Sequence, residues 1–461
     1  MTATDTAKLE AVPLRITDPE RIPARRYYDK EFFELEREKL WPHVWQMACR
    51  LEQIPEVGDY VEYRILDKSV IVVRTKTGVK AFHNACRHRG LLLASGHGNC
   101  KTKGFICPFH GWRWNIDGEN TFVFAKEIFS EEALEKAELN LVPCRVEEWG
   151  GCAFINFDDD APGFRESMGP AAARMEARNI GKLRMEWWYA TELPTNWKLA
   201  MEAFLEGYHV MRTHPQLHAI MLPQMGSYGS DVGGKMSTHV TSREIVERSY
   251  HLMELNAQGM GGLVMPHELE IAKRAMDMDL PDDPGEAVMA YYARIKADVL
   301  EEGLKEGRPV FDIGAVEVNH GFAAVEFLFP HFFILPFFSA MSGYRIRPLT
   351  PETCLFELWS LAPMTEDDPR PPIKEPTILP YDSEQFPEIP RQDYSNLPLQ
   401  QRGLHAKGFE YMRLSREKEG TISNYQRLID GFLAGLDKEK LRKATQIVSQ
   451  GYEAPILDIG F

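Results

Sequence analysis

Residues 86–90 read Cys-Arg-His-Arg-Gly, and residues 107–112 read Cys-Pro-Phe-His-Gly-Trp. Each of these two short stretches offers one thiol and one imidazole to a metal. Both lie between runs rich in Val, Ile and Tyr, which their composition and alternation predict to be strands. The sequence therefore predicts a metal centre held by two loops of a small all-β domain.

Two kinds of metal centre suit the side chains of Cys86, His88, Cys107 and His110. Structural zinc sites usually pair cysteine with cysteine and histidine with histidine, whereas each stretch here is mixed. The mixed arrangement favours a [2Fe-2S] cluster, with both cysteines on one iron and both histidines on the other. We expect both imidazoles near the surface, where electrons would enter and leave. Gly90 and Gly111 would let the backbone turn close to the cluster and point N–H groups at its sulfurs.

The strands around these stretches outline the first domain. We expect residues 1–40 to form an arm with one helix at 28–40, and residues 41–160 to form the all-β domain. Three consecutive strands are predicted at residues 57–66, 69–75 and 79–85.

The rest of the chain, residues 170–461, predicts a second domain that mixes helices and strands. Within it, residues 222–320 combine Gly-rich stretches with two charged helical segments, and we interpret them as an insertion or lid. The Phe-rich run at 322–341 predicts sheet core, and some of its side chains are candidates to line an apolar pocket. Strands are expected near 184–192, 323–335, 343–348 and 353–361, helices near 171–179, 266–278, 285–306, 404–418 and 421–436, and a Pro-rich loop at 369–390.

A second group of candidate ligands lies in residues 196–215, which read NWKLAMEAFLEGYHVMRTHP. On one helix Glu202, Glu206 and His209 would share a face, and the apolar residues around them indicate a buried helix. Buried carboxylates and imidazoles need partners or a metal. The proline after His214 disfavours helical backbone there, so we expect the helix to end and that imidazole to turn back. Two histidines with one carboxylate form the facial triad of non-haem Fe(II) oxygenases.

Both groups of residues resemble the motifs of one family. The two loop stretches closely resemble the Rieske signature C-x-H…C-x-x-H, in the C-P-x-H-G-W form of ring-hydroxylating oxygenases. Residues 196–214 resemble the motif N-W-K-x3-E-N-x2-D-x-Y-H-x4-H of their catalytic subunits, with Ala203 in place of Asn and Glu206 in place of Asp. The resemblance covers most of the chain but not the predicted insertion in detail.

The resemblance implies a role for the matched residues. The two stretches would hold a Rieske [2Fe-2S] cluster, and His209 and His214 would bind a mononuclear Fe(II). Glu206 would be a catalytic bridging carboxylate, hydrogen-bonded to His209 and to a cluster histidine of a neighbouring subunit. The implied cluster ligands are Cys86, His88, Cys107 and His110.

The third iron ligand comes late in the sequence in this family, some residues before a Q-x-G-L run. Here that run begins at Gln401, and Asp393 precedes it. We choose Asp393 as the third ligand, although Asp is also common in loops and helix caps. The competing carboxylates nearby are Asp382, Glu384 and Glu388.

The resemblance also implies a fold and a function. The fold would be α+β, with an N-terminal all-β Rieske domain followed by a helix-grip (START-like) catalytic domain on an antiparallel sheet. The chain would be the large (alpha) subunit of a Rieske non-haem iron aromatic-ring-hydroxylating oxygenase, using O2 and electrons from NAD(P)H on an apolar, aromatic substrate. A ferredoxin, a reductase or both would deliver the electrons, since no G-x-G-x-x-G turn occurs in the sequence. A head-to-tail homotrimer, with or without beta subunits, would bring each cluster to the neighbour's iron.

Three alternatives stay open at this point. A monooxygenase performing N- or O-dealkylation would use the same metals. A Rieske electron carrier fused to a lipid-binding domain would hold no iron at the two histidines. A binding protein stabilised by zinc would use the cysteines and histidines of the loops for structure alone.

The amino-acid composition excludes several classes of protein. The chain has 53 Lys and Arg against 68 Asp and Glu, a net charge of −15, which argues against a nucleic-acid partner. No apolar run approaches the ~20 residues of a membrane span, and the N-terminal residues lack the pattern of a secretory signal. Seven scattered cysteines do not suggest a secreted disulfide framework. We therefore expect a cytoplasmic enzyme with no membrane partner.

Overall fold

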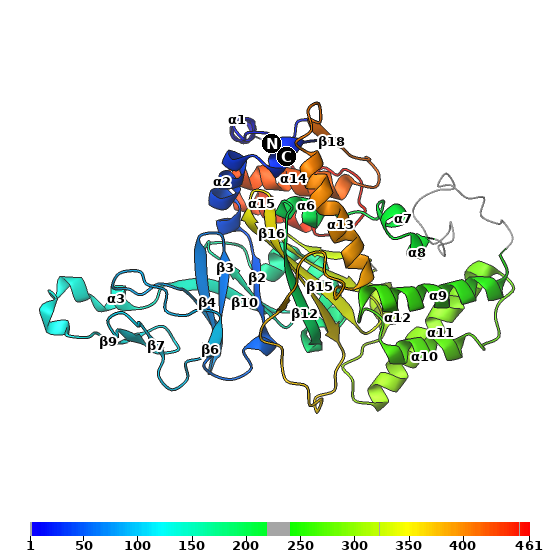
Figure 1. The fold of residues 1–461 in the computed structure, drawn as a ribbon, viewed down its shortest axis with the longest axis horizontal. Helices are drawn as coiled ribbons and strands as arrows, with labels where there is room; N and C mark the ends of the chain where they lie inside the picture. The colour runs from blue at the N-terminus through cyan, green and yellow to red at the C-terminus, as the bar shows by residue number, and fades with distance from the viewer. Residues whose placement is uncertain (1, 219–239, 322, 451) are drawn as a thin grey trace.

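The computed structural model describes residues 2–218, 240–321, 323–450 and 452–461 (Figure 1). The Gly-rich stretch at 226–234, part of the predicted insertion, lies outside the described residues. Two sheets form the centre of the molecule, an extension with short strands reaches out at one end, and a group of helices lies at the other. The two chain ends lie side by side. Among the described residues, no helix has the length and apolar character needed to cross a membrane.

The N-terminal arm packs against the C-terminal part of the chain. Strand β1 (Arg21–Pro23) pairs antiparallel with β18 (Tyr411–Arg413). Close by, the buried guanidinium of Arg26 pairs with the carboxylate of Asp430. Helix α2 (Lys30–Lys39) follows and confirms the helix predicted in the arm.

The all-β part contains β2 (Gln46–Arg50), β3 (Asp59–Ile65), β4 (Lys68–Thr75), β5 (Gly78–His83), β6 (His97–Asn99), β7 (Phe105–Ile106), β8 (Arg113–Trp114), β9 (Asn120–Phe122), β10 (Pro143–Trp149) and β11 (Cys152–Asn156). Seven of these strands form an antiparallel sheet with the order β2-β11-β10-β5-β4-β3-β6. The three strands predicted from the alternating runs are β3, β4 and β5, which pair with one another in sequence order. The extension carries the separate sheet β7-β8-β9.

The second part is built on β12 (Arg184–Leu193), β13 (Glu326–Leu328), β14 (Phe332–Pro336), β15 (Met341–Thr350), β16 (Thr353–Ala362) and β17 (Thr377–Ile378). Their order is β13-β14-β15-β16-β12-β17, antiparallel except where β17 joins β12 in parallel. Strands β12, β15 and β16 confirm the strands predicted at 184–192, 343–348 and 353–361. The single strand predicted at 323–335 was wrong, because a turn at residues 329–331, which contains Pro330, divides it into the antiparallel strands β13 and β14. Successive residues of β15 and β16 are mostly buried, because both faces of this sheet are covered.

The remaining helices are α1 (Ala3–Glu10), α3 (Lys136–Leu139), α4 (Phe164–Met168), α5 (Pro170–Ala177), α6 (Trp197–Glu202), α7 (Val210–Thr213), α8 (Pro215–His218), α9 (Ser242–Met260), α10 (Pro266–Ala275), α11 (Pro284–Lys305), α12 (Ile313–His320), α13 (Glu388–Gly403), α14 (Gly420–Leu433) and α15 (Lys438–Val448). Helices α10 and α11 confirm the two charged helices predicted in the insertion. They pack with α9 around buried apolar side chains such as Val246, Ile271 and Tyr291.

The structure corrects the continuous helix predicted from residue 196 to His214. Helix α6 ends at Glu202, turns follow, and α7 begins only at Val210. The break lets the two carboxylates point to different partners, Glu202 to Tyr27 and Glu206 to His209. A continuous helix would place both buried carboxylates on one face, where like charges disfavour each other.

A second correction concerns the helix predicted at 404–418. The described residues of that segment form turns and β18, and the helix lies earlier, as α13. Helix α13 was not predicted because its sequence contains Pro390 and Pro398, and proline argues against a helix. Pro390 lies in the first turn, where a backbone N–H has no helical partner, and the cost of Pro398 is offset by burial of neighbours such as Tyr394.

Candidate metal centres

The loops that begin at Cys86 and Cys107, called the cluster loops below, have the same backbone turn. The N–H of Cys86 donates to the carbonyl of Leu91 at 2.8 Å, and the N–H of Gly90 donates to the carbonyl of Cys86 at 2.9 Å. Two bonds at the same spacing close the loop from Cys107 to Gly111. The two glycines have φ of +77° and +71°, a conformation that side chains with a Cβ rarely adopt. Both loops are therefore fixed locally by a glycine four residues after the cysteine.

Backbone N–H groups of the first cluster loop point at a cysteine sulfur. The glycine N–H groups close the turns, while the N–H groups of His88 and Arg89 contact the Cys86 thiol. The two thiols of Cys86 and Cys107 also contact each other and are buried. Burial raises the pKa of the Cys86 thiol. The sulfur side of the centre thus faces the protein interior.

The imidazoles lie on the other side of the cluster loops, half-buried as predicted. The Nδ1 atoms of His88 and His110 are 3.2 Å apart. Two nitrogens bound to one tetrahedral metal at 2.0–2.1 Å would lie roughly 3.4 Å apart. The His88 ring also stacks on Trp112, with centroids 4.9 Å apart. The residues present fit a group that takes two imidazoles on its exposed side.

A single zinc ion fits these four side chains poorly. Four ligands on one ion would bring their atoms within about 4 Å of one another. Among the described residues, the one group of three or more potential ligands whose atoms approach within 4.8 Å lies elsewhere, at His209, His214 and Asp393. The thiol pair and the imidazole pair are therefore too far apart for one ion, and a centre with two metal atoms fits better.

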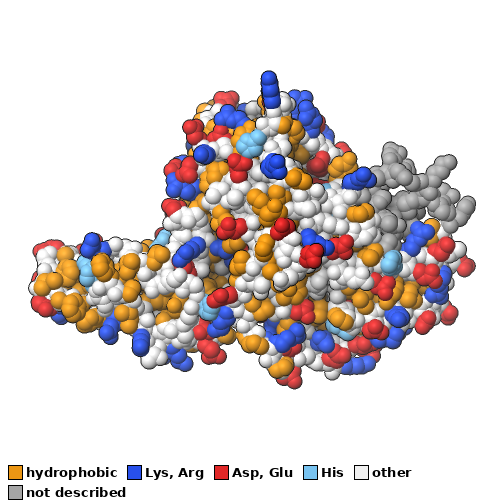
Figure 2. Space-filling model, in the orientation of Figure 1, with side chains coloured by type: hydrophobic (Ala, Val, Ile, Leu, Met, Phe, Trp, Pro, Cys, Tyr) orange, Lys and Arg blue, Asp and Glu red, His pale blue; other side chains and the backbone are white. Residues whose placement is uncertain are grey.

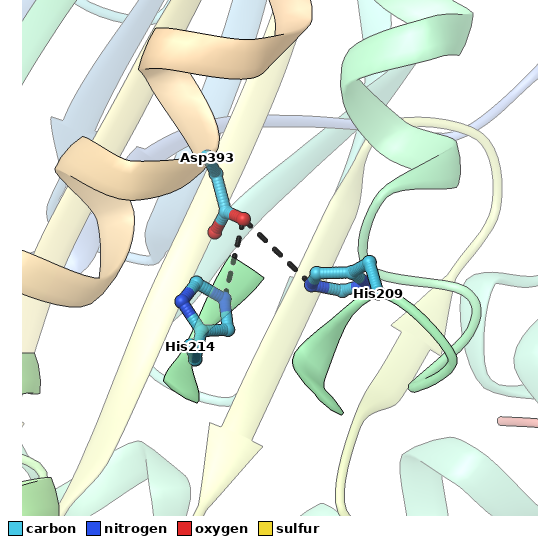
Figure 3. Close-up of side chains that lie close together, drawn as sticks. All are labelled: His209, His214 and Asp393. Atoms are coloured by element: carbon cyan, nitrogen blue, oxygen red, sulfur yellow. Dashed lines mark ion pairs between the residues drawn. The ribbon is translucent and has the colours of Figure 1, made fainter. Parts of the chain in front are cut away.

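The second centre brings together residues that are far apart in the sequence (Figure 3). His209 precedes α7, His214 lies between α7 and α8, and Asp393 projects from α13. The Oδ1 atom of Asp393 is 3.3 Å from Nε2 of His214 and 3.7 Å from Nε2 of His209. These three side chains, called the triad below, are the ones predicted, and their placement on one point fits a metal ion.

Each triad histidine has a hydrogen-bond partner on its other nitrogen. Nδ1 of His209 is 2.7 Å from Oε1 of Glu206, whose Oε2 also accepts the His209 backbone N–H at 3.0 Å. Nδ1 of His214 is 2.6 Å from Oε1 of Gln392. Because both partners are acceptors, each Nδ1 carries the proton and each Nε2 lone pair faces Asp393. Sequence reasoning missed Gln392, for which the only available signal was its position beside a predicted ligand.

Charge and burial act in opposite directions on His209. Burial lowers its pKa, but the hydrogen bond and charge of Glu206, together with the charge of Asp393, raise it overall. The other motif carboxylate, Glu202, lies away from the triad and accepts a hydrogen bond from the Tyr27 hydroxyl at 2.8 Å. Burial raises the pKa of Glu202 to about 7. It therefore joins α6 to the N-terminal arm rather than acting as a fourth ligand.

An apolar cavity adjoins the triad. Its lining includes Val210, Leu217, Met260, Leu263, Val325 and Leu335, with one amide from Asn256. Of the Phe-rich run, Val325 and Leu335 thus reach this cavity, while phenylalanines such as Phe333 are core residues. An apolar lining with few polar groups is typical of a small-molecule site.

Glu206 lines both this cavity and an open groove, as do His209 and Asp393. The groove also contains the exposed Tyr208 ring together with Arg212 and Arg413. The carboxylate that holds His209 is thus reached from the molecular surface.

Two families match the chain. The family described as "Ring hydroxylating alpha subunit (catalytic domain)" matches residues 180–435, more than half of the chain. The family described as "Rieske [2Fe-2S] domain" matches residues 44–125. The first match contains the triad and the second contains both cluster loops.

Similar sequences include two kinds of oxygenase. The chain is 34% identical over 197 residues to the carnitine monooxygenase oxygenase subunit of Escherichia coli (strain K12). This aligned region covers 42% of this chain and 52% of the relative. The chain is 31% identical over 215 residues to the biphenyl dioxygenase subunit alpha of Paraburkholderia xenovorans (strain LB400), covering 43% and 46%. The chain thus spans about half the length of the curated relatives it matches.

Similar solved structures cover nearly the whole chain. Naphthalene 1,2-dioxygenase with indole bound has a TM-score of 0.63 at 19% identity, covering 94% of this chain and 97% of the other. A quaternary ammonium Rieske monooxygenase in complex with L-carnitine has a TM-score of 0.58 at 18% identity, covering 90% and 97%. At these identities the likeness shows a shared fold.

Proposed function

This chain belongs to the family of ring-hydroxylating alpha subunits, and from that premise we propose that it is the oxygenase component of a multicomponent Rieske system. It takes electrons from NAD(P)H through a separate ferredoxin, reductase or both, and uses O2 to hydroxylate a small apolar, aromatic compound. The observation that carries the proposal is that one chain holds two different ligand sets, the paired thiols and imidazoles of the cluster loops and the triad.

In this proposal the cluster loops hold the [2Fe-2S] cluster. Cys86 and Cys107 bind the buried iron, and His88 and His110 bind the half-exposed one. When bound, the cluster supplies single electrons and the mononuclear iron supplies the position where O2 is activated. The half-exposed imidazoles give an electron-transfer partner access to the centre.

His209, His214 and Asp393 are the proposed ligands of the mononuclear Fe(II). Glu206 and Gln392 hold the two imidazoles in the tautomer that presents Nε2 to the metal. Three protein ligands leave open positions, and the apolar cavity beside them offers a place where a substrate would bind.

We propose that Glu206 connects the triad to a cluster in a neighbouring subunit. The cluster loops lie in the extension at one end of the molecule, which also stands out in Figure 2, and α7 and α8 lie toward the other end (Figure 1). A head-to-tail homotrimer, with or without beta subunits, would place a neighbour's imidazoles in the open groove beside Glu206.

The predicted division of the chain is part of the proposal. Residues 1–40 form an arm and helix, 41–160 the Rieske domain and 170–461 the catalytic domain, with 222–320 as an insertion. Each family match falls inside the corresponding range. A cytoplasmic location accords with a supply of reduced electron donors.

A monooxygenase that removes an N- or O-alkyl group is the second candidate. The carnitine monooxygenase relatives support this second candidate, because their sequences are as similar to this chain as the sequences of the dioxygenases are. Both reactions use the same ligand sets, so turnover must decide between them.

The test is metal analysis followed by turnover with 18O-labelled O2. Protein loaded anaerobically with ferrous iron and sulfide is expected to hold about three irons and two sulfides per chain. With a surrogate reductase and a panel of aromatic and N-alkyl compounds, two labelled oxygens in a diol indicate dioxygenation, and one labelled oxygen in an alcohol indicates monohydroxylation. Release of the alkyl group as an aldehyde indicates dealkylation. A single kind of metal centre, or a colourless protein that holds zinc, would overturn the proposal.

A further inference from the structure

A second cavity, the junction cavity, lies where the all-β part meets the second part. It has a volume of about 220 Å³ and shares no lining residue with the cavity beside the triad. One wall comes from the segment before β2 and from β11, and the other comes from α4, α14 and α15. Its apolar lining includes Trp45, Met168, Phe329, Phe432, Leu436 and Leu441.

One polar side chain in this lining lacks a partner. Asn156, at the end of β11, is fully buried. Its Oδ1 accepts the backbone N–H of Asp158 at 2.9 Å, which fixes the orientation of the amide. Its Nδ2 then has no hydrogen-bond partner among the residues that the structure describes. By the alternation along β11, the side chain points to the same side as Phe154, in the core that contains Trp45 and Met168. A buried donor without a partner is costly and points to a missing acceptor.

Among the charged side chains that line the cavity, Lys39 is exposed to solvent, and the others described here are paired with charges of the protein itself. The Asp158 carboxylate lies 2.8 Å from Nζ of Lys438 and 3.0 Å from Nδ1 of His43. Arg442 lies 2.6 Å from the carboxylate of Glu439. A ligand with a net charge would have to break these pairs or bury an unpaired charge, so the site favours a neutral ligand.

We propose that the junction cavity binds a small neutral aryl carbonyl compound. The ring packs among the apolar side chains, and the carbonyl oxygen accepts a hydrogen bond from Nδ2 of Asn156. A carbonyl suits this site because it accepts without bringing a donor that would need its own partner. Because the walls come from both parts of the molecule, the bound ligand stabilises their junction.

The experiment compares acetophenone with ethylbenzene, which has the same carbon skeleton but no acceptor, by calorimetric titration of the protein. Acetophenone is expected to bind about tenfold more tightly, as one added hydrogen bond to an unpartnered donor predicts. In Asn156→Leu, which keeps the apolar volume and removes the donor, this preference is expected to disappear. Asn156→Asp, which is isosteric but presents an acceptor in place of the donor, is expected to lose acetophenone binding. This second variant tests the same hydrogen bond if the Leu variant does not fold.

Two cavity-filling variants locate the ligand. Leu436→Trp fills the junction cavity and is expected to abolish the tenfold preference for acetophenone, whereas Leu263→Trp fills the cavity beside the triad and is expected to leave that preference unchanged. A preference that survives both Asn156 variants, or one that is lost in Leu263→Trp, would place the ketone beside the triad and overturn the inference. These binding results are independent of the metal content and the turnover, which test the proposed function.

Discussion

The cluster loops and the triad hold their ligands in different ways. The cluster loops repeat one short turn, each closed by its own backbone hydrogen bonds and a glycine at positive φ. The triad has no such local frame, because Asp393 comes from α13 while the histidines flank α7. There the orientation of each imidazole depends on a side chain, Glu206 or Gln392. The cluster loops are thus set by backbone conformation, and the triad is set by tertiary contacts.

This difference fits the two proposed tasks. A centre that exchanges electrons benefits from a rigid backbone and half-exposed imidazoles, since its ligands need not move. A centre that binds O2 beside a substrate needs open positions, and hydrogen bonds to the imidazoles keep those ligands oriented while the rest of the coordination changes. Variants that disturb only the cluster loops or only the triad test this comparison.

The largest effect is expected from removing one ligand at each centre. Cys107→Ala should abolish the red-brown colour and all turnover but keep iron at the triad, and His214→Ala should abolish turnover but keep the colour. The reason is that the two ligand sets share no residue. Visible absorption and iron content per chain check both variants, and loss of both metals in either variant would contradict independent centres.

Glu206→Gln is expected to keep both metals and to slow turnover by about 10- to 100-fold, because it removes the charge that holds His209. The measurement is the rate of product formation, compared with the rate of cluster reduction in the same protein, which should not change. Glu419→Gln is the matched control, since Glu419 lines the same groove but accepts a hydrogen bond from the N–H of Ser415. Equal rates in the two variants would remove Glu206 from the proposed electron path.

Gln392→Leu is expected to weaken iron binding at the triad by about tenfold, because Nδ1 of His214 loses its acceptor. Competition for ferrous iron with a chelator measures the affinity, while the absorption of the cluster should stay the same. Gln392→Glu, which keeps an acceptor at this position, should restore most of the affinity. If the Leu variant binds iron as tightly as the unmodified protein, His214 is oriented by other contacts.

The smallest effect is expected from the glycine of a cluster loop. A Cβ at Gly111 meets no atom within 4 Å, so Gly111→Ala should cost about 1–2 kcal/mol of unfolding free energy through its φ of +71° alone. Gly403→Ala, at the end of α13, also meets no atom and should be neutral or slightly stabilising. Denaturant unfolding compares the two, and an equal response would mean that backbone conformation does not set the cluster loops apart.

The same contrast explains what the sequence could predict. The cluster loops were predictable because their ligands and their glycines lie within a few residues of one another, and the short strands around them follow simple alternation. His209 and His214 were predictable for the same reason. Asp393 needed the family motif, because nothing local distinguishes it from the acidic residues nearby.

The parts that were wrong or missed depend on distant partners. The break after α6 follows from the contact of Glu202 with Tyr27, which is 175 residues away. Helix α13 forms in spite of Pro398 because its side chains are buried by the rest of the domain. The role of Gln392 depends on His214, 178 residues earlier. Such contacts exist only in the folded chain, so no local pattern reports them.

The pairing of β1 with β18 has a consequence for biosynthesis. Residues 21–23 are translated hundreds of residues before their partners at 411–413 and before the Asp430 carboxylate that pairs with Arg26. The arm therefore stays unpaired while the intervening residues are translated. Contacts of such long sequence separation slow folding and leave apolar surface open meanwhile. The arm can thus reach its folded position only once the segment that carries β18 and Asp430 has been synthesised.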